Sequence, residues 1–339
     1  MKDRKVMGKL VLPVLIVALV VLLLISFALG RFPVPIQEVV RIFLSKLGLN
    51  LSETWTAAME AAVLRIRLPR ILLACMVGCC LASAGAAYQG VFQNPMAAPD
   101  LLGASSGAAF GAALAILLGG SSGWITLSAF FFSLLTVALV ILVAYRSPGK
   151  RTTSLILGGV MITSLFTAGT SYIKLVADPN NQLPQITYWL MGSLSGSSLK
   201  NLGFAAIPMA VGLIPLMLIR WQVNLLSLGD DEARAMGVRV NAVRLTVVLC
   251  STLVTAASVS VSGMIGWVGL VVPHLCRKLV GNDFRRLLPA SMLMGAGFLL
   301  LVDDISRNLL TTEIPIGILT AFIGAPFFLY LITRKEKNV

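Results

Sequence analysis

The sequence predicts an all-α polytopic membrane protein with about ten transmembrane helices. Hydrophobic residues fill 57% of its 339 positions, charged residues fill only 12%, and the mean hydropathy is +0.91. That charged share is about half the share in a soluble domain, and a soluble fold of this length cannot bury so much apolar surface. The same composition excludes a disordered chain, a collagen-like chain, a coiled coil and a disulfide scaffold.

The first predicted helix covers residues 10–30 and follows four basic residues, Lys2, Arg4, Lys5 and Lys9. A signal peptide shows the same order, but its apolar core has only about 7–15 residues. This apolar run has the length of a full span, about 20 residues, and no clear cleavage site follows it. We therefore expect an uncleaved first helix whose N-terminus lies in the cytoplasm.

Nine further apolar segments have the length and hydropathy of predicted helices. In the third helix, Gly103, Gly107 and Gly111 form a GxxxGxxxG pattern, which lets a neighbouring helix approach closely. Prolines in or near the spans are tolerated where neighbouring helices satisfy the freed carbonyl groups. The predicted ranges are 68–90, 98–119, 123–145, 152–176, 201–220, 241–261, 265–280, 288–304 and 314–333.

The distribution of Lys and Arg indicates the orientation of the chain. An even number of spans places both termini on one side, and cytoplasmic loops carry an excess of Lys and Arg. With both termini in the cytoplasm, 18 of the 27 basic residues fall in inner segments, and six of the other nine fall in one outer segment, 31–70. The net charge of +13 therefore reflects membrane topology rather than nucleic-acid binding.

The chain lacks the residues of a catalytic or metal site. The pairs Gly8–Lys9 and Gly149–Lys150 are not followed by Ser or Thr, so the sequence has no P-loop. His274 is the single histidine and cannot form a metal site alone. The five cysteines lie in or beside apolar runs and are interpreted as buried small side chains.

Acidic residues within the predicted helices are also scarce, although ion-coupled carriers usually keep them near the midplane. Asp303 and Asp304 lie one turn from Arg307 at the outer end of a helix, where a local ion pair is expected. The energy for transport would therefore come from a partner.

The inner segment 225–240 contains a short predicted helix outside the bilayer. Asp230, Asp231 and Glu232 lie at its start, where the helix dipole favours anions. Gly237 lies where a helix would end in a left-handed residue. This segment is either a solvated loop helix or a docking surface for a cytoplasmic partner, with Ala233, Ala235 and Met236 as its small apolar face.

Five stretches form a series along the chain: RLPR at Arg67–Arg70, QNPMAAPDLLGASSGA at Gln93–Ala108, LGDDEARAMGV at Leu228–Val238, GMIGWVGLVVPHLCR at Gly263–Arg277, and EIPIGILTAFIGAPFF at Glu313–Phe328. In this order they resemble the FecCD family, the permease subunits of binding-protein-dependent ABC importers for iron–siderophores, haem and cobalamin. The resemblance runs from the first helix to the C-terminus. Its motifs are specific for the family and much less specific for the cargo.

The resemblance implies one permease domain with inverted repeats at 68–176 and 241–333, a sixth helix at 201–220 and a cytoplasmic coupling loop at 225–240. The translocation path would lie between this chain and a second permease copy or a paralogue. Two ABC ATPase subunits would dock on the cytoplasmic side and bind ATP and Mg, and a substrate-binding protein would dock outside. The chain itself would hold no cofactor or metal, contact membrane lipid but no nucleic acid, and lie in the plasma membrane of a prokaryote.

The resemblance also implies a docking site for the binding protein. Arg67, Arg70 and Arg307 would be exposed and would meet acidic residues of that protein, because arginine recognises carboxylates with two parallel hydrogen bonds. In the alternative, these arginines anchor helix ends at the lipid headgroups.

Two further sites follow from the resemblance. The cytoplasmic gate would include Asn94 and Met96 after the second helix and Thr152 and Thr153 before the fifth. The loop that couples to the ATPase would comprise Leu228, Gly229, Asp230, Asp231, Glu232, Ala233, Arg234, Ala235, Met236, Gly237 and Val238.

We therefore predict a non-enzymatic permease subunit that carries an Fe(III)–siderophore complex, with haem or cobalamin as alternative cargoes. An ion-coupled secondary carrier is the alternative from another class, and the scarcity of midplane carboxylates argues against it. A membrane enzyme is disfavoured because no catalytic constellation is present.

Overall fold

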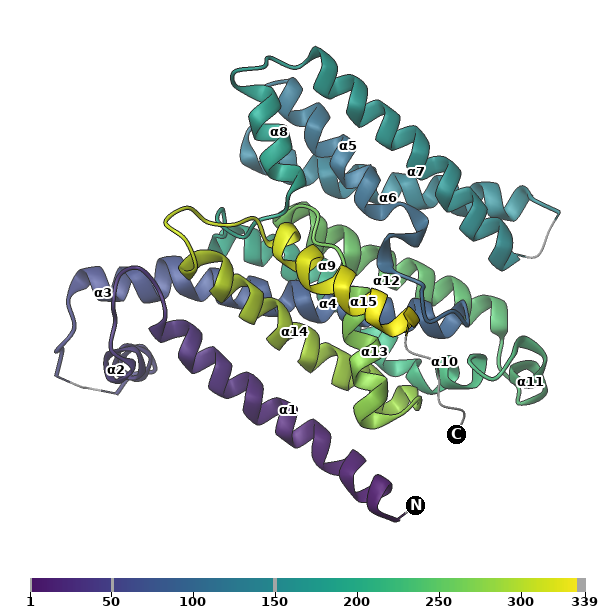
Figure 1. Ribbon diagram of the computed structural model, residues 1–339, viewed down its shortest axis with the longest axis horizontal. Helices are drawn as coiled ribbons and strands as arrows, with labels where there is room; N and C mark the ends of the chain where they lie inside the picture. Colours follow the sequence, from purple (N-terminus) through teal and green to yellow (C-terminus); the bar gives the residue numbers. More distant parts are fainter. Residues whose placement is uncertain (1, 50–51, 149–150, 334–339) are drawn as a thin grey trace.

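The computed structural model describes residues 2–49, 52–148 and 151–333, and every regular element in these ranges is a helix (Figure 1). The basic residues Lys2, Arg4, Lys5, Lys9, Lys150, Arg151, Arg334, Lys335 and Lys337 of the topology prediction lie outside the described residues or side chains. The elements are α1 (Lys2–Ala28), α2 (Ile36–Lys46), α3 (Ala57–Ala61), η1 (Ala62–Arg67), α4 (Leu68–Val91), η2 (Pro99–Leu102), α5 (Ala104–Leu117), α6 (Ser122–Arg146), α7 (Arg151–Val176), α8 (Gln182–Leu190), α9 (Leu199–Leu218), α10 (Arg220–Leu226), α11 (Asp230–Ala235), α12 (Val240–Ser262), α13 (Val268–Val280), α14 (Phe284–Asn308) and α15 (Ile316–Thr333).

Each of the ten predicted helices has a counterpart in the structure, but three of them begin later than predicted, including the last, which begins at Ile316 instead of residue 314. The segment 98–119 is divided into η2 and α5, and the helix predicted at 265–280 begins at Val268. Among the described residues, seven helices have the length and hydropathy of a membrane span, and α5 and α15 are apolar but shorter. The protein is therefore a polytopic α-helical membrane protein, while the count of ten crossings and the side of the termini stay predictions.

The helix α4 lies at the centre of the bundle, where it packs against α12, α13 and α14. Glycines make this packing possible. Gly78 of α4 lies against Gly295 of α14, and a Cβ on Gly85 would lie only 1.8 Å from the carbonyl oxygen of Gly269 in α13. The backbones therefore touch, as small residues allow at membrane helix contacts.

The predicted GxxxGxxxG pattern acts in the same way between α5 and α6. A Cβ on Gly107 would meet the Thr136 hydroxyl at 2.0 Å, and a Cβ on Gly111 would meet the Ser128 carbonyl at 2.5 Å. The predicted close approach at this pattern is confirmed.

The helix contacts follow a reciprocal pattern between the first and second halves of the chain. The helix α4 packs against α14, and α12 packs against α6; likewise α4 packs against α13, and α12 against α5. If α4, α5, α6 and α7 are matched in order with α12, α13, α14 and α15, each contact of α4 corresponds to a contact of α12. An internal repeat produces this pattern, and the inverted repeats at 68–176 and 241–333 stay a prediction.

The helices α5 and α13 are short because each begins inside the bundle. Gly103, which precedes α5, lies against Thr136 and Thr163, near the middles of α6 and α7. Both helices follow a residue in the left-handed region, Gly103 at φ 77° and Trp267 at φ 70°. A left-handed tryptophan is strained, and here it packs against Gly324 of α15, where a side chain would collide with it.

The long helices place chemically different segments at the two ends of the molecule (Figure 1). The helix α1 begins at the right of the view, the end that carries α11, and finishes at the left, where α2 and α3 lie. The candidate functional residues lie at these two ends of the molecule.

Candidate functional site

The three arginines predicted to capture a binding protein lie together at the end opposite α11. Arg67 is the last residue of η1, Arg70 lies in the first turn of α4, and Arg307 lies in the last turn of α14. Their exposed fractions are 5%, 8% and 8%. The expectation of exposed side chains is therefore wrong, because each guanidinium group already has acceptors within the chain. Their role in docking stays a prediction.

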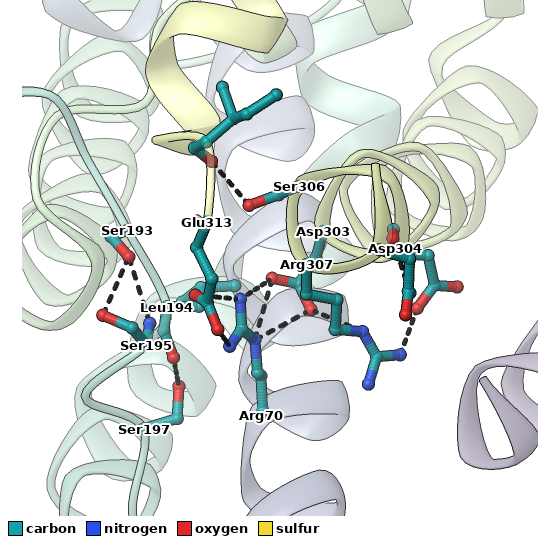
Figure 2. A network of polar contacts seen from close by, with 12 residues as sticks. Arg70, Ser193, Leu194, Ser195, Ser197, Asp303, Asp304, Ser306, Arg307 and Glu313 are labelled. Atoms are coloured by element: carbon teal, nitrogen blue, oxygen red, sulfur yellow. Dashed lines mark hydrogen bonds and ion pairs between the residues drawn. The ribbon is translucent and has the colours of Figure 1, made fainter. Parts of the chain in front are cut away.

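Arg70 is the centre of an ion-pair network (Figure 2). Its Nε donates to both carboxylate oxygens of Asp303 at 3.0 and 3.1 Å, and its Nη1 and Nη2 donate to Glu313 at 2.9 and 3.0 Å. The two parallel hydrogen bonds to Glu313 fix both the position and the orientation of its carboxylate, whereas the two oxygens of Asp303 share the N–H of Nε. Asp303 is fully buried and Glu313 is 28% exposed. Because Glu313 precedes α15, Arg70 connects α4, α14 and the entry to α15.

Arg307 joins the end of α14 to the end of α1. Its Nη2 donates to Asp304 and to the carbonyl and hydroxyl oxygens of Ser26, the latter two at 2.9 and 2.8 Å. The Ser26 hydroxyl in turn donates to Asp304 at 2.6 Å. The predicted ion pair of Arg307 with Asp303 and Asp304 is present in the structure.

Arg67 binds the main chain rather than a carboxylate among the described residues. Its guanidinium donates to the carbonyl oxygens of Phe27, Ala28 and Phe32. The last carbonyls of a helix have no partner within the helix. Arg67 therefore caps α1 and holds it against η1.

A cavity of about 200 Å³ opens among these side chains. Arg31, Arg67, Arg70 and Arg307 line it together with one acidic residue, Glu313. Arg31 is exposed, unlike the other three arginines. Neither Arg31 nor Glu313 was predicted as a site residue, although Arg31 follows the first span and Glu313 begins the EIPIG motif.

At the opposite end, the segment 228–238 forms α11 and its flanking turns. Asp230, the first residue of α11, pairs with Arg244 of α12 at 2.8 and 3.0 Å, which attaches the loop to the bundle. The side chain of Asp231 is 92% exposed. Gly237 is left-handed, at φ 81°, and confirms the predicted end of the helix.

The exposed surface of α11 differs from the predicted one at two residues. Ala233 is fully buried and Val238 is nearly so, and both belong to the hydrophobic core of the chain. The placement of Ala233 on an outer apolar face is therefore wrong, because that side of α11 packs inward. The coupling-loop residues that remain exposed are Leu228, Asp231, Glu232, Arg234, Ala235, Met236 and Gly237.

The four predicted gate residues lie in two segments. Asn94 and Met96 are exposed in the turn after α4, where the Asn94 side chain accepts the Met96 N–H at 2.9 Å. Thr152 and Thr153 lie in the first turn of α7, and Thr153 is the more exposed of the two. Their action as a gate stays a prediction.

The short helix α10 connects the α11 loop to two long helices. Gln93, next to the predicted gate residue Asn94, donates from Nε2 to the Leu226 carbonyl of α10 at 2.9 Å. The Asn224 side chain of α10 accepts the N–H of Phe284, the first residue of α14, at 3.0 Å. The end of α4, the start of α14 and the loop that carries α11 are therefore joined.

An apolar cavity of about 620 Å³ opens beside α15. Met191, Met264, Trp267, Phe322 and Pro326 are among its lining residues, and every lining residue is uncharged. Such a surface offers apolar contact without a charged group and without a His, Cys, Asp or Glu ligand.

Comparison with known proteins gives consistent matches over the chain. The model of the FecCD transport family matches residues 18–334. The chain is 39% identical over 321 residues to the molybdate import system permease protein MolB of Haemophilus influenzae, covering 94% of both chains. It is 38% identical over 319 residues to the probable iron chelatin transport system permease protein of Helicobacter pylori, covering 94% of this chain and 97% of that relative.

A solved structure shares the same fold. It shows an inward-facing conformation of a transporter assigned to the metal-chelate ABC type, with a TM-score of 0.85 and 39% identity, covering 96% of this chain and 99% of the other. Together with the seven apolar helices, these matches place the protein in the plasma membrane of a prokaryote. The chain therefore belongs to the FecCD transport family and is a permease of the ABC importer type.

Proposed function

We propose that this chain lines one half of the path by which an importer carries a bulky metal chelate, with an Fe(III)–siderophore complex as the cargo and haem or cobalamin as alternatives. The supporting observation is the uncharged apolar cavity beside α15. A chelate presents a mostly organic surface and a filled metal coordination sphere. It can therefore move past an uncharged wall that supplies no carboxylate, imidazole or thiolate ligand.

Molybdate is a second candidate cargo, because a relative of 39% identity is named for molybdate import. A small oxyanion is strongly hydrated, and it usually needs hydrogen-bond donors or cations to replace its water. The two cargoes thus predict different behaviour at the same cavity.

Uptake by the complete importer separates these candidates. The permease, its ATPase and its binding protein would be reconstituted into liposomes and supplied with ATP and either a radioactive ferric siderophore or radioactive molybdate. We expect saturable, ATP-dependent uptake of the ferric chelate that excess molybdate does not inhibit. Uptake of molybdate alone would reject the chelate and retain the permease function.

The importer is proposed to contain a second permease copy or a paralogue, two ABC ATPase subunits and an extracytoplasmic binding protein. The ATPase subunits would bind ATP and Mg and perform hydrolysis, so that this chain acts as a non-enzymatic transport subunit. The exposed, charged α11 and its link through α10 to Gln93 and Asn94 support a coupling role for this end. The predicted gate is therefore next to the segment on which the ATPase is proposed to act.

Charge reversal on α11 should weaken the proposed contact with the ATPase. Asp231→Lys combined with Glu232→Lys changes two exposed carboxylates and leaves the buried Ala233 and the Asp230–Arg244 pair in place. Exposed ion pairs contribute about 0–1 kcal/mol each, so association should weaken by about ten-fold. Co-purification and titration of the ATPase onto permease in nanodiscs would measure this change.

The matched control for this variant is Glu53→Lys, which reverses an exposed carboxylate at the opposite end of the molecule. It should leave ATPase association unchanged. Equal affinity of the α11 variant and the parent would remove α11 from the interface.

Arg31→Glu is a sharper test of docking at the arginine cavity than any change to Arg67 or Arg70. Arg31 is exposed, so its replacement leaves the buried network in place, whereas Arg67→Glu would set a carboxylate against three carbonyl oxygens. We expect binding-protein affinity to fall up to about ten-fold at low salt, and the difference to shrink at high salt because exposed charges are screened. Lys200→Glu, an exposed basic residue on α9, is the control. An unchanged affinity at low salt would place Arg31 outside the docking surface.

A further inference from the structure

The helix α2 lies across the bundle rather than along it. In Figure 1 this helix is seen end-on, while α1 and α14 extend across the picture. The long apolar helices have the length and hydropathy to cross a bilayer, so a helix that lies across them would run in the plane of the membrane. The helix α2 lies beside the end of α1, and residues 30–32, which connect α1 to α2, line the cavity that contains Arg31, Arg67, Arg70 and Arg307.

The helix α2 has three distinct sides, which follow from its helical periodicity. Val39 and Ile42 are buried against the bundle. Ile36 and Val40, one turn apart, are 50% and 41% exposed, and Leu47 on the same side is 80% exposed. The third side is polar and carries Gln37, Glu38, Arg41 and Ser45.

Contacts with its neighbours hold α2 in this rotation. The ring of Phe43 packs edge-to-face on Phe27 of α1 at 5.1 Å. Lys46 pairs with Glu60 of α3 at 2.6 Å. The exposed apolar side therefore cannot turn inward without breaking an aromatic contact and an ion pair.

The polar side of α2 is also fixed. The Thr54 hydroxyl donates to Glu38 at 2.7 Å, and Arg41 donates to Thr54 at 2.7 Å. The segment that follows α2 thus contacts the polar side through Thr54, leaves Gln37 and Arg41 exposed there, and leaves the apolar side bare.

The bare apolar side continues an apolar surface of α1. The span of α1 has a mean hydropathy of 3.3 and only 11% of its residues are buried, so its outward side faces lipid. Leu24 and Ile25 at its end, and Leu29 and Phe32 in the connection to α2, are exposed apolar residues. No charged side chain interrupts this surface between Leu24 and Ile36 except Arg31.

We propose that α2 is an interfacial helix that lies in the headgroup layer of the outer leaflet, with Ile36, Val40 and Leu47 in contact with phospholipid acyl chains. An amphipathic helix binds in the plane of the membrane because its apolar residues enter the boundary between headgroups and acyl chains while its polar residues remain in water. Because Arg67 caps the same end of α1 that Phe43 contacts, α2 sets the height of the arginine cavity above the lipid. The inference does not depend on the cargo or on the docking partner.

Adjacent residues on the two exposed sides of α2 give a matched test. In a cysteine-free permease in nanodiscs, single cysteines from Val40→Cys and Arg41→Cys would carry an environment-sensitive fluorophore. With spin-labelled phospholipid we expect loss of more than half of the emission at Val40 and little loss at Arg41. Aqueous iodide should give the reverse order.

If the cysteine-free protein does not fold, Val40→Trp and Arg41→Trp in the native background, read against brominated lipids, give the same comparison. Equal quenching at the two sites would overturn the proposal. A disulfide between the Val40→Cys sites of two copies, or protection of Val40 only when the binding protein is added, would also overturn it and assign the apolar side to a protein partner.

Discussion

Asp303→Ala should destabilise the permease by about 3 kcal/mol, at the lower end of the range for breaking a buried ion pair, because Arg70 would keep only the partly exposed Glu313 as a carboxylate partner. Asp303 is fully buried and accepts two hydrogen bonds from Arg70, and its carboxylate also lies 3.8 Å from Arg307. Its loss would leave each of the two nearly buried guanidinium groups with one carboxylate partner, Glu313 for Arg70 and Asp304 for Arg307. The fraction of monodisperse protein after heating in detergent would measure the effect.

Two controls separate charge loss from loss of packing. Glu313→Gln should cost less, since Glu313 is partly exposed and Arg70 retains Asp303. The double variant Arg70→Met with Asp303→Leu should recover much of the stability, because well-packed apolar pairs often replace buried ion pairs without loss. If Asp303→Ala is as stable as the parent, the network contributes nothing to folding.

Gly85→Val should prevent α4 and α13 from packing and should abolish recovery of folded protein. A Cβ at Gly85 would lie 1.8 Å from the carbonyl oxygen and 2.5 Å from the carbonyl carbon of Gly269, which are main-chain atoms that no rotamer change can move. Overpacking a core costs about 1–3 kcal/mol when side chains can adjust, and this contact would exceed that range. Size-exclusion profiles of the detergent-extracted variant would show the loss.

The control is Gly123→Ala on α6, where an added Cβ meets no atom within 4 Å. It should extract and migrate as the parent does, since alanine favours the helix more than glycine. Equal yields of folded protein for Gly85→Val and the control would show that the helices can separate at this point without cost.

The helices could be predicted from the sequence because a membrane span is recognised by length and hydropathy alone. The late starts of α5 and α13 could not. The segments 98–103 and 265–267 are assigned to these helices because they are largely apolar, and irregular backbone is tolerated at membrane depth where protein surrounds it. A prediction based on hydropathy therefore includes these segments in the helices that follow them.

The site was predictable where partners are close in sequence. Arg307 lies three and four residues from Asp304 and Asp303, so their pairing follows from helical spacing. Arg70 binds Asp303 and Glu313, which follow it in the sequence by 233 and 243 positions. No local sequence pattern predicts these partners. Its burial, like that of Ala233 in α11, depends on the tertiary fold.

The hydrogen bonds of α10 to Gln93 and Phe284 have a mechanical consequence. They attach the α11 loop to the end of α4 and the start of α14, and these two helices pack backbone to backbone where Gly78 contacts Gly295. The two helices would therefore tilt together as one unit. Its length is about 36 Å, because α4 has 24 residues and an α-helix rises 1.5 Å per residue. Arg70 and Asp303 lie at the other end of this pair of helices. A displacement of α11 and the binding of a partner at the arginine cavity would therefore act on opposite ends of the same two helices.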